Sequence, residues 1–384
     1  MRSSGILHEN FFIGEGSLSH LDSITEKENY QNIILFTDPV GFRLNGAADY
    51  FKRLETKPYI NSIKEVSYEG KALPLEDLER LYAGLRDEST VDAIIAVGGG
   101  TVIDAAKILS IAISNRCTQV AEVLDNRQLQ NKLPLVFIPT TAGTGSEATS
   151  FAVVYRERVK ISIDNQSLLP SYVILEPLLL RSLPEPVLHS TVLDALAQGT
   201  ESIWAVGSTD ESHGYSRRAL LLILENIHAQ PSILRLSNLQ LGSYWAGRAI
   251  NISKTTLSHS ISYPITAHFG VPHGIAVFLT LPEVAEMNFH TTAETKQDAV
   301  KLEKVRDAFS LIFSLYGVED VEGLKERLKE VMNWLKIKSR LRDYGIGRTD
   351  LPFIASRALT KGRSDNNPRK FTESEILELL NRIF

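Results

Sequence analysis

Three short apolar runs in the first half of the chain each stop at a polar or glycine-rich turn. They are NIILFTD (32–38), DAIIAVGGG (92–100) and LPLVFIPTT (133–141). Runs of this length, rich in β-branched residues, are typical of buried strands in a parallel sheet. Stretches with helical spacing lie between them, at 77–87 and 102–114. This alternation predicts βαβ construction, in which helices cover an open parallel sheet.

The second half of the chain has a different pattern. From about Pro184 onward, long helical patterns follow one another and strand signals are few. The segment EPLLLRSLPEP carries three prolines and indicates a boundary near 178–186. A chain of 384 residues is also long for one compact core. We therefore expect an α/β domain over 1–180 and an all-helical domain over 181–384.

Composition excludes several classes of protein. The net charge is −5, so the strongly basic face of a nucleic-acid-binding protein is not expected. The only cysteine, Cys117, rules out an internal disulfide, which fits a reducing compartment. The chain has no apolar run of about 18 residues and no apolar leader at its start. We expect a cytoplasmic enzyme or binding protein that needs neither a nucleic acid nor a membrane.

Two segments in the first half could hold a nucleotide. GGGTVIDAAK (98–107) follows a predicted strand and opens a predicted helix, whose N-terminus can bind a pyrophosphate. It lacks the GxGxxG spacing, and a tight strand-to-helix turn is an equally good interpretation. PTTAGTGSEATS (139–150) also follows a strand, although a solvated loop is its alternative. Both lie at the carboxyl ends of strands, where open α/β sheets bind ligands.

Asp38 ends the first of these predicted strands. A carboxylate in this place can accept hydrogen bonds from an adenosine ribose and would repel a 2′-phosphate, which favours NAD(H) over NADP(H). The alternative is an aspartate that stabilises a turn before Pro39.

Metal-ligand residue types gather in the second half. Asp194 and Gln198 are four residues apart on one predicted helix face. His259, His268 and His273 fall within fifteen residues, in a chain with nine histidines. Imidazole and carboxylate together suit zinc or iron. Any one of these histidines alone would be interpreted as structural, but the cluster favours a metal.

Four of these motifs occur together in a known order. GGGTVIDAAK, PTTAGTGSEAT, DALAQGTES and HSISYPITAHFGVPHG resemble the group III metal-dependent, or "iron-containing", alcohol dehydrogenases. NNPRKFTESEILELL is similar to the closing segment of that family, so the resemblance covers essentially the whole chain. It implies an N-terminal dinucleotide-binding domain, a C-terminal helical metal-binding domain of the dehydroquinate synthase-like type, and a cleft between them. It also implies a homodimer.

The resemblance further implies hydride transfer between NAD(P)H and a small alcohol or aldehyde, with one divalent metal, iron or zinc. Its metal ligands would be Asp194, Gln198, His259 and His273. Matched motif by motif, the residues that it places at the cofactor are Asp38, Gly98, Gly99, Gly100, Thr101, Asp104, Thr140, Thr141, Thr144, Ser146 and Lys160.

This sequence departs from the family pattern at two places. Gln198 stands where the family usually has histidine, and an amide oxygen is a weaker ligand than imidazole for zinc or ferrous iron. Asp194, His259 and His273 with a water would be a workable alternative set. Tyr263 stands where many members have a second histidine near the reacting centre. Tyr263 or His268 is then the candidate for proton transfer, and Lys160, close to the cofactor, is a third candidate catalytic residue.

A narrower resemblance concerns the substrate. SHSISYPITAHFGVPHG is similar to a branch of the family that includes phosphonoacetaldehyde reductases. An anionic substrate needs cationic partners, and Arg363, Asn366 and Arg369 are candidates because guanidinium groups suit phosphonate oxygens. The alternative is a solvated basic loop.

Two other functions fit parts of the pattern. Dehydroquinate synthase-like lyases share the two-domain plan, the bound NAD and the metal, but release no reduced cofactor. A non-catalytic nucleotide-binding descendant would explain the loss of histidine at Gln198.

Overall fold

The chain folds into two compact units. The structure is a computed structural model that describes residues 10–384 except 71, 89, 127 and 158. The N-terminal unit comprises the residues up to 142 together with 146–184 and 231–241. The C-terminal unit comprises 143–145, 185–230 and 242–384.

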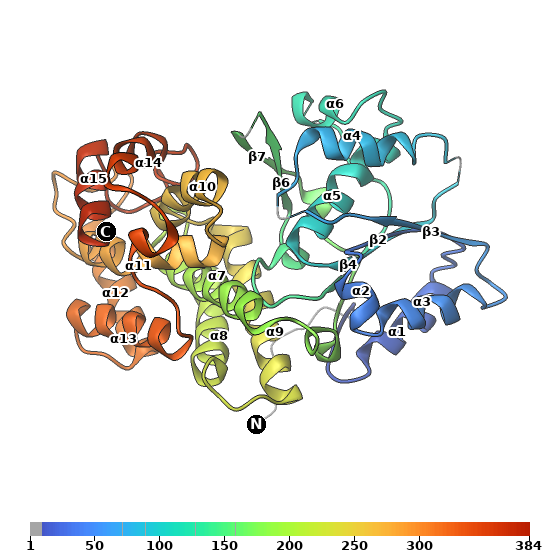
Figure 1. Cartoon of the computed structure of the whole chain (residues 1–384), viewed down its shortest axis with the longest axis horizontal. Helices are drawn as coiled ribbons and strands as arrows, with labels where there is room; N and C mark the ends of the chain where they lie inside the picture. The colour runs from blue at the N-terminus through green and yellow to red at the C-terminus, as the bar shows by residue number, and fades with distance from the viewer. Residues whose placement is uncertain (1–9, 71, 89, 127, 158) are drawn as a thin grey trace. The chain divides into compact units, whose positions relative to one another are not determined.

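The N-terminal unit combines strands with covering helices (Figure 1). Its strands are β1 (Phe11–Ile13), β2 (Asn32–Thr37), β3 (Ser62–Ser67), β4 (Ala93–Gly98), β5 (Leu135–Pro139), β6 (Phe151–Arg156), β7 (Val159–Asp164) and β8 (Tyr172–Leu175). Its helices are α1 (His20–Lys27), α2 (Gly41–Leu44), α3 (Ala47–Glu55), α4 (Leu75–Ala83), α5 (Gly100–Ser114) and α6 (Ala121–Asp125).

Six strands form one sheet in the order β1-β8-β5-β4-β2-β3, and every pairing in it is parallel. β6 and β7 form a separate antiparallel hairpin. The predicted strands at 32–38, 92–100 and 133–141 are three adjacent strands of the sheet, β2, β4 and β5. Their carboxyl ends therefore lie side by side, which brings the segments that follow β4 and β5 next to each other.

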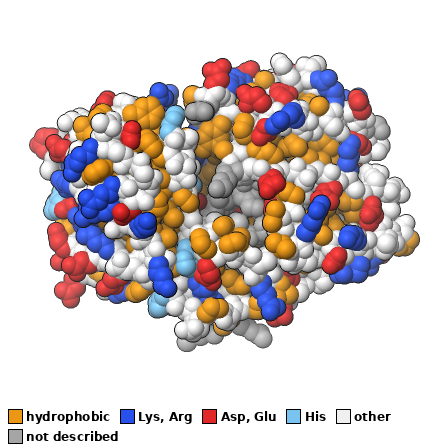
Figure 2. Space-filling model, viewed as in Figure 1, with side chains coloured by type: hydrophobic (Ala, Val, Ile, Leu, Met, Phe, Trp, Pro, Cys, Tyr) orange, Lys and Arg blue, Asp and Glu red, His pale blue; other side chains and the backbone are white. Residues whose placement is uncertain are grey.

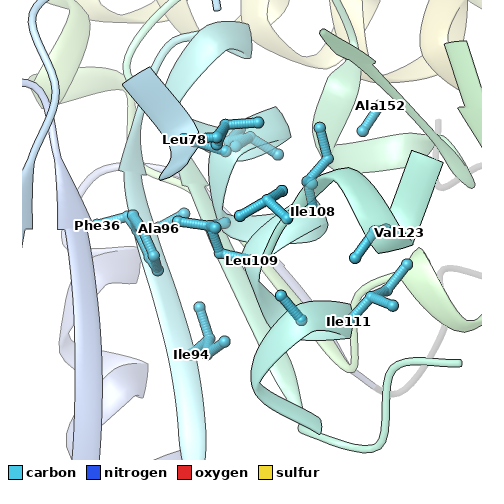
Figure 3. Packing of buried hydrophobic residues seen from close by; sticks show 14 of the residues in the cluster. Phe36, Leu78, Ile94, Ala96, Ile108, Leu109, Ile111, Val123 and Ala152 are labelled. Carbon is cyan, nitrogen blue, oxygen red and sulfur yellow. The ribbon is translucent and has the colours of Figure 1, made fainter. Parts of the chain in front are cut away.

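The core of this unit lies around α5. The helix is apolar on most of its circumference, because it is covered by the sheet on one side and by α4, α6 and β6 on others. Figure 3 shows side chains of α5 among those of the sheet, with Leu109 on the side of Ala96 and Phe36. This packing fixes the start of α5, the glycine-rich turn, relative to the sheet.

The C-terminal unit is helical. Its helices are α7 (Glu185–Trp204), α8 (Asp210–Asn226), the second half of α9 (Ile233–Ser253), α10 (Leu257–Phe269), α11 (His273–Phe289), α12 (Leu302–Tyr316), α13 (Val321–Trp334), α14 (Leu351–Arg357) and α15 (Glu373–Arg382). α7 and α11 pack closely along each other, and α7 also contacts α8. The predicted fold class, a parallel-sheet domain joined to a helical domain, is confirmed.

The surface carries mixed charge. On the face drawn in Figure 2, Lys and Arg side chains lie among Asp and Glu side chains over both units. Among the described residues, no helix has the length and apolar character required for a membrane span.

Candidate functional site

The turn between β4 and α5 has the properties of an anion-binding site. Gly98 needs to be glycine because a Cβ there would lie 2.7 Å from Cβ of Val102. Gly99 is the N-cap of α5, and no side chain caps the helix. The first turn of α5 also contains no acidic residue. Its main-chain N–H groups and positive dipole end therefore suit a phosphate, as the sequence predicts for Gly98, Gly99, Gly100 and Thr101.

Lys107 fixes the second predicted cofactor segment. Its ammonium is fully buried and donates to the main-chain carbonyls of Ser146 (2.6 Å), Thr149 (2.7 Å) and Phe151 (2.9 Å). Burial lowers the pKa of Lys107 to about 8, although Asp104 and Glu147 act against this effect. The side chain is thus still charged at neutral pH, and three N–H donors hold the segment against α5.

Asp104 and Ser146 bind each other. The Ser146 hydroxyl donates to one oxygen of the Asp104 carboxylate, and the other oxygen accepts the Val153 N–H at 3.0 Å. Burial raises the pKa of Asp104, while Lys107 and, more weakly, Lys160 act in the opposite direction. Lys160 lies on β7 of the hairpin and is close enough to affect that carboxyl. Three predicted cofactor residues are therefore neighbours in one network.

Glu147 is a buried ionisable group in this segment, with 2% of its surface exposed. Burial raises its pKa from 4.5 to about 7, although a hydrogen bond from its own main-chain N–H and the charge of Lys107 both act to lower the pKa. Between pH 4.5 and 7 the folded state therefore binds more protons at this site than the unfolded chain does. The cost in stability grows through this range and is fully present above pH 7.

We expect Glu147→Gln to stabilise the protein at alkaline pH, because glutamine cannot ionise. The gain in the free energy of unfolding should approach about 3 kcal/mol at pH 8 and vanish below about pH 4.5. Thermal melting at pH 8 and pH 4.5 measures it, with Glu69→Gln, an exposed glutamate, as the control. Equal melting shifts for Glu147→Gln at both pH values would contradict the assignment.

Asp38 stabilises a turn after β2, which was the alternative interpretation of this residue. One oxygen of its carboxylate accepts the Gly41 N–H at 2.6 Å, at the start of α2. The side chain is half-buried just after β2. Because Asp38 is held in place by this bond, its negative charge stays at the carboxyl end of the sheet, where a ribose could meet it.

The tip of the second segment, residues 143–145, belongs to the C-terminal unit. Gly143 lies against Thr191 of α7, and Gly145, with φ +60°, lies against Gly247 of α9; a Cβ on either glycine would overlap its neighbour. Thr144 lies between these two contacts. Thr140 and Thr141, before the tip, remain in the N-terminal unit next to the end of β5.

Asp194, His259 and His273 converge in the C-terminal unit. One ligand atom of each lies within 4.8 Å of the others. Nε2 of His259 is 3.2 Å from Oδ1 of Asp194, and Nε2 of His273 is 4.0 Å from the same oxygen. Asp194 and His259 are buried and His273 is partly exposed. Three side chains from α7, α10 and α11 thus surround one point, with access from the side of His273.

Gly274 explains why His273 reaches Asp194. A Cβ on Gly274 would lie 1.8 Å from the main-chain oxygen of Ser190. Only a residue without a side chain allows the start of α11 to approach α7 this closely. His273 is the first residue of α11, so this approach places its ring one turn along α7, beside Asp194.

Both histidines have Nδ1 bound to protein. Nδ1 of His259 contacts the Glu201 carboxylate, which can only accept a hydrogen bond when ionised. Nδ1 of His273 lies 3.4 Å from the Ser262 hydroxyl, whose single hydrogen is donated to the main-chain oxygen of His259. Both Nδ1 atoms therefore act as donors, and both Nε2 atoms face Asp194, where a metal could bind in place of a proton.

Gln198 lies one turn after Asp194 on α7 and is buried. Its side-chain nitrogen donates to the main-chain oxygen of Thr144 at 3.3 Å. Its side-chain oxygen has no hydrogen-bond partner among the described residues, although it is buried. A buried acceptor without a partner costs free energy, so this oxygen suits a cation.

The charge of the site favours a positive ion. Burial alone would lower the pKa of His259, but the Glu201 and Asp194 carboxylates outweigh burial and raise it. The two buried carboxylates thus attract a positive charge, which a proton on His259 or one divalent cation would supply.

The structure separates the two candidates for proton transfer. Tyr263 follows His259 by four residues, and its ring stacks on His273 with centroids 6.2 Å apart. His268 follows His259 by nine residues, which at 3.6 residues per turn is roughly the opposite face of α10. It is exposed and contacts the Phe353 ring edge-on. The structure therefore brings Tyr263 to the cluster and does not bring His268 there.

The three substrate candidates also differ. Arg363 is half-buried, and its Nε donates to the Tyr263 hydroxyl at 3.3 Å. The Asn366 amide donates to two main-chain oxygens and accepts a main-chain N–H, so it holds its loop together. Arg369 is paired with Glu375 at 2.6 Å. Of the three, only Arg363 is connected to the cluster, through Tyr263.

Sequence reasoning did not predict Glu201 or Lys107. Glu201 follows Asp194 by seven residues and Gln198 by three, which places all three on one helix face. That spacing was the available signal for Glu201. Lys107 closes the GGGTVIDAAK motif as a lysine in an otherwise apolar helix, and its apolar neighbours were the signal that it is buried.

Family models match both halves of the chain. The model described as "Iron-containing alcohol dehydrogenase" matches residues 9–177, and the model of the C-terminal region of the same family matches residues 189–384. The chain therefore belongs to the iron-containing alcohol dehydrogenase family. It is an oxidoreductase of the alcohol dehydrogenase and aldehyde reductase type.

Individual relatives give the same result. The chain is 31% identical to phosphonoacetaldehyde reductase of Streptomyces viridochromogenes over 75% of each sequence. It is 33% identical to the probable alcohol dehydrogenase EutG of Escherichia coli over 79% of this chain and 76% of the relative. Among solved structures, sulfoacetaldehyde reductase of Bifidobacterium kashiwanohense in complex with NAD+ has a TM-score of 0.83 and 22% identity, with 99% of each chain covered. That structure supports the fold.

Proposed function

We propose that this protein is a metal-dependent reductase of small anionic aldehydes, with NAD(H) as its cofactor. The observation that carries the proposal is the convergence of Asp194, His259 and His273, with both imidazole Nε2 atoms directed at one carboxylate. This arrangement suits a divalent metal, iron or zinc.

The residues present fit a metal. Asp194 contributes a charged oxygen, and the two histidines contribute neutral nitrogens. Gln198 is the proposed fourth ligand, because its oxygen is buried one turn from Asp194 and accepts no hydrogen bond from the residues that the structure describes. When bound, the metal supplies Lewis-acid polarisation of the substrate carbonyl.

Other residues bind the cofactor or act on the substrate carbonyl in this proposal. Gly98, Gly99, Gly100 and Thr101 bind the cofactor pyrophosphate in this proposal, and Asp38 meets the ribose and disfavours a 2′-phosphate. Tyr263, whose ring stacks on His273, is the proposed proton donor to the substrate oxygen. The nicotinamide supplies the hydride.

Arg363 is the proposed partner of the substrate anion. Its Nε donates to Tyr263 and its Nη1 donates to the main-chain oxygen of Gly362, which leaves Nη2 without a hydrogen bond among the described residues. The guanidinium is held beside a ring that stacks on His273, and a planar fork suits phosphonate oxygens.

The proposal is tested by steady-state assays with a panel of short aldehydes that includes phosphonoacetaldehyde and uncharged compounds of similar size. Each is combined with NADH or NADPH, and with Fe²⁺ or Zn²⁺ added to chelator-treated protein. We expect metal-dependent oxidation of NADH, with the anionic aldehyde preferred. Equal kcat/KM for charged and uncharged aldehydes would exclude the anion preference, and no NAD(P)H oxidation with any aldehyde would exclude the reductase.

Replacing Arg363 by methionine should show how much of the substrate preference depends on the charge of this side chain, because methionine keeps a similar apolar stem. We expect kcat/KM for phosphonoacetaldehyde to fall about 10- to 100-fold, because a charge-assisted hydrogen bond contributes roughly 1.5–3 kcal/mol. The value for an uncharged short aldehyde should change by less than about threefold. Lys361→Met removes an exposed positive charge two residues away and serves as the control. Equal losses on both substrates would contradict a role in anion binding.

A further inference from the structure

Glu201 is a buried carboxylate next to the proposed metal ligands. It lies on α7, seven residues after Asp194, and its side chain is fully buried. One of its oxygens contacts Nδ1 of His259. The other accepts the Ser258 N–H at 3.0 Å and the Thr256 hydroxyl at 2.6 Å.

These contacts leave the charge of Glu201 without an opposite charge from a basic side chain. The donors that the described residues supply are a ring N–H, a main-chain N–H and a hydroxyl, and none belongs to Lys or Arg. Hydrogen bonds reduce the cost of burying a carboxylate, but a neighbouring cation is the stronger compensation. When His259 is neutral and binds a metal through Nε2, the proposed cation on the far side of its ring is therefore the natural counter-ion.

The hydrogen bonds of Glu201 also fix the orientation of its carboxylate. Thr256 accepts the Trp204 indole N–H at 2.9 Å, so its own hydrogen is committed to Glu201. With the Ser258 N–H on the same oxygen, the carboxylate is fixed on one side. The other oxygen is then oriented to accept only from His259.

We propose that Glu201 is a positioning residue for metal binding. It holds His259 in the tautomer with hydrogen on Nδ1, which directs the Nε2 lone pair to the metal, and it supplies the second negative charge that balances a divalent ion. This inference rests on the metal site of the proposed function and goes beyond it by naming a residue that does not touch the metal.

A glutamine at position 201 cannot accept hydrogen bonds from both the Ser258 N–H and the His259 ring, because only one of its two terminal atoms is an acceptor. If its oxygen faces the Ser258 N–H, its NH₂ group faces Nδ1 of His259 and forces the hydrogen onto Nε2, toward the metal. If its oxygen faces His259, the NH₂ group opposes the Ser258 N–H. A merely structural carboxylate would show a loss of stability, whereas a positioning carboxylate also changes the tautomer of the ring.

The test measures metal binding to chelator-treated full-length protein, with Co²⁺ and Zn²⁺ as the probes. Glu201→Gln should weaken the Kd about 10- to 100-fold and change the visible spectrum of bound Co²⁺. In ¹⁵N-histidine NMR, the Zn²⁺-loaded wild-type protein should show the Nδ1–H pattern for His259, and Glu201→Gln at the same Zn²⁺ concentration should lose it in favour of the Nε2–H pattern. Thr200→Val, on the same helix as Glu201, removes a buried hydrogen bond to Tyr316 away from the Glu201 carboxylate and His259, and should change the Kd by less than about threefold.

Glu201→Asp provides a second variant, because it keeps the charge but shortens the side chain. It should weaken the Kd roughly tenfold with the Nδ1–H tautomer retained. Wild-type affinity in both Glu201 variants would overturn the inference while leaving the metal site intact, provided that Asp194→Ala loses the metal. Absence of metal binding by the wild-type protein would instead overturn the proposed function itself.

Discussion

Replacing Asp194 by alanine is expected to lower kcat for aldehyde reduction by about a thousandfold or more. Asp194 provides the carboxylate oxygen that both His259 and His273 face. Its loss therefore removes the charged metal ligand and one of the two negative charges of the site. A thousandfold decrease corresponds to about 4 kcal/mol of transition-state stabilisation, a magnitude typical for electrostatic groups at a reacting centre. Metal analysis should show less than one tenth of the wild-type content.

The same variant should bind NADH within about threefold of the wild-type Kd, as measured by nicotinamide fluorescence, because Asp194 is not among the predicted cofactor residues. His290→Ala, which removes an exposed histidine after α11, should leave both activity and metal content unchanged. Full turnover by chelator-treated Asp194→Ala protein would contradict a catalytic metal at this place.

Lys107→Met should produce the largest effect on stability. Methionine fills much of the same volume but leaves three main-chain carbonyls, those of Ser146, Thr149 and Phe151, without their common donor. Buried acceptors that lose a partner cost about 1–3 kcal/mol each before relaxation or entry of water. We expect the free energy of unfolding to fall by roughly 3 kcal/mol, measured by urea denaturation.

The cofactor should bind at least about tenfold more weakly to this variant, because the segment that Lys107 holds carries Ser146. Lys132→Met, at an exposed position of the same unit, is the matched control and should behave like the wild type. Unchanged NADH affinity in destabilised Lys107→Met protein would show that the lysine supports only the fold.

Much of the fold was predictable because its central elements have strong patterns. The helix predicted at 102–114 is α5, which begins two residues earlier at Gly100, and its long apolar sequence leaves little ambiguity. β2, β4 and β5 are apolar runs because both faces of a central parallel strand are covered. β3 (SIKEVS) was not predicted, since an edge strand can be polar, and the charged hairpin β6–β7 was missed for a similar reason.

The site was predictable at the level of residue types and spacing. The sequence indicated that Asp194, His259 and His273 could share an ion, because ligand types recur there at unusual density. It did not reveal that Gln198 donates to Thr144 while its oxygen has no hydrogen-bond partner in the part of the chain that the structure describes, since the direction of an amide depends on tertiary contacts. Likewise, nothing local distinguishes Arg363 from Arg369, whose pairing with Glu375 is visible only in the folded chain.

The tip at 143–145 has a consequence for chimeric proteins. These three residues pack on α7 and α9, whereas the strand and loop that carry them belong to the other unit. A crossover between two parent genes near residue 184 would therefore join a helical half from one parent to a tip from the other. The tip contacts Gly247 of α9 through Gly145, and the Gln198 amide through Thr144. We therefore expect functional recombinants to need the tip and these two contact residues from the same parent.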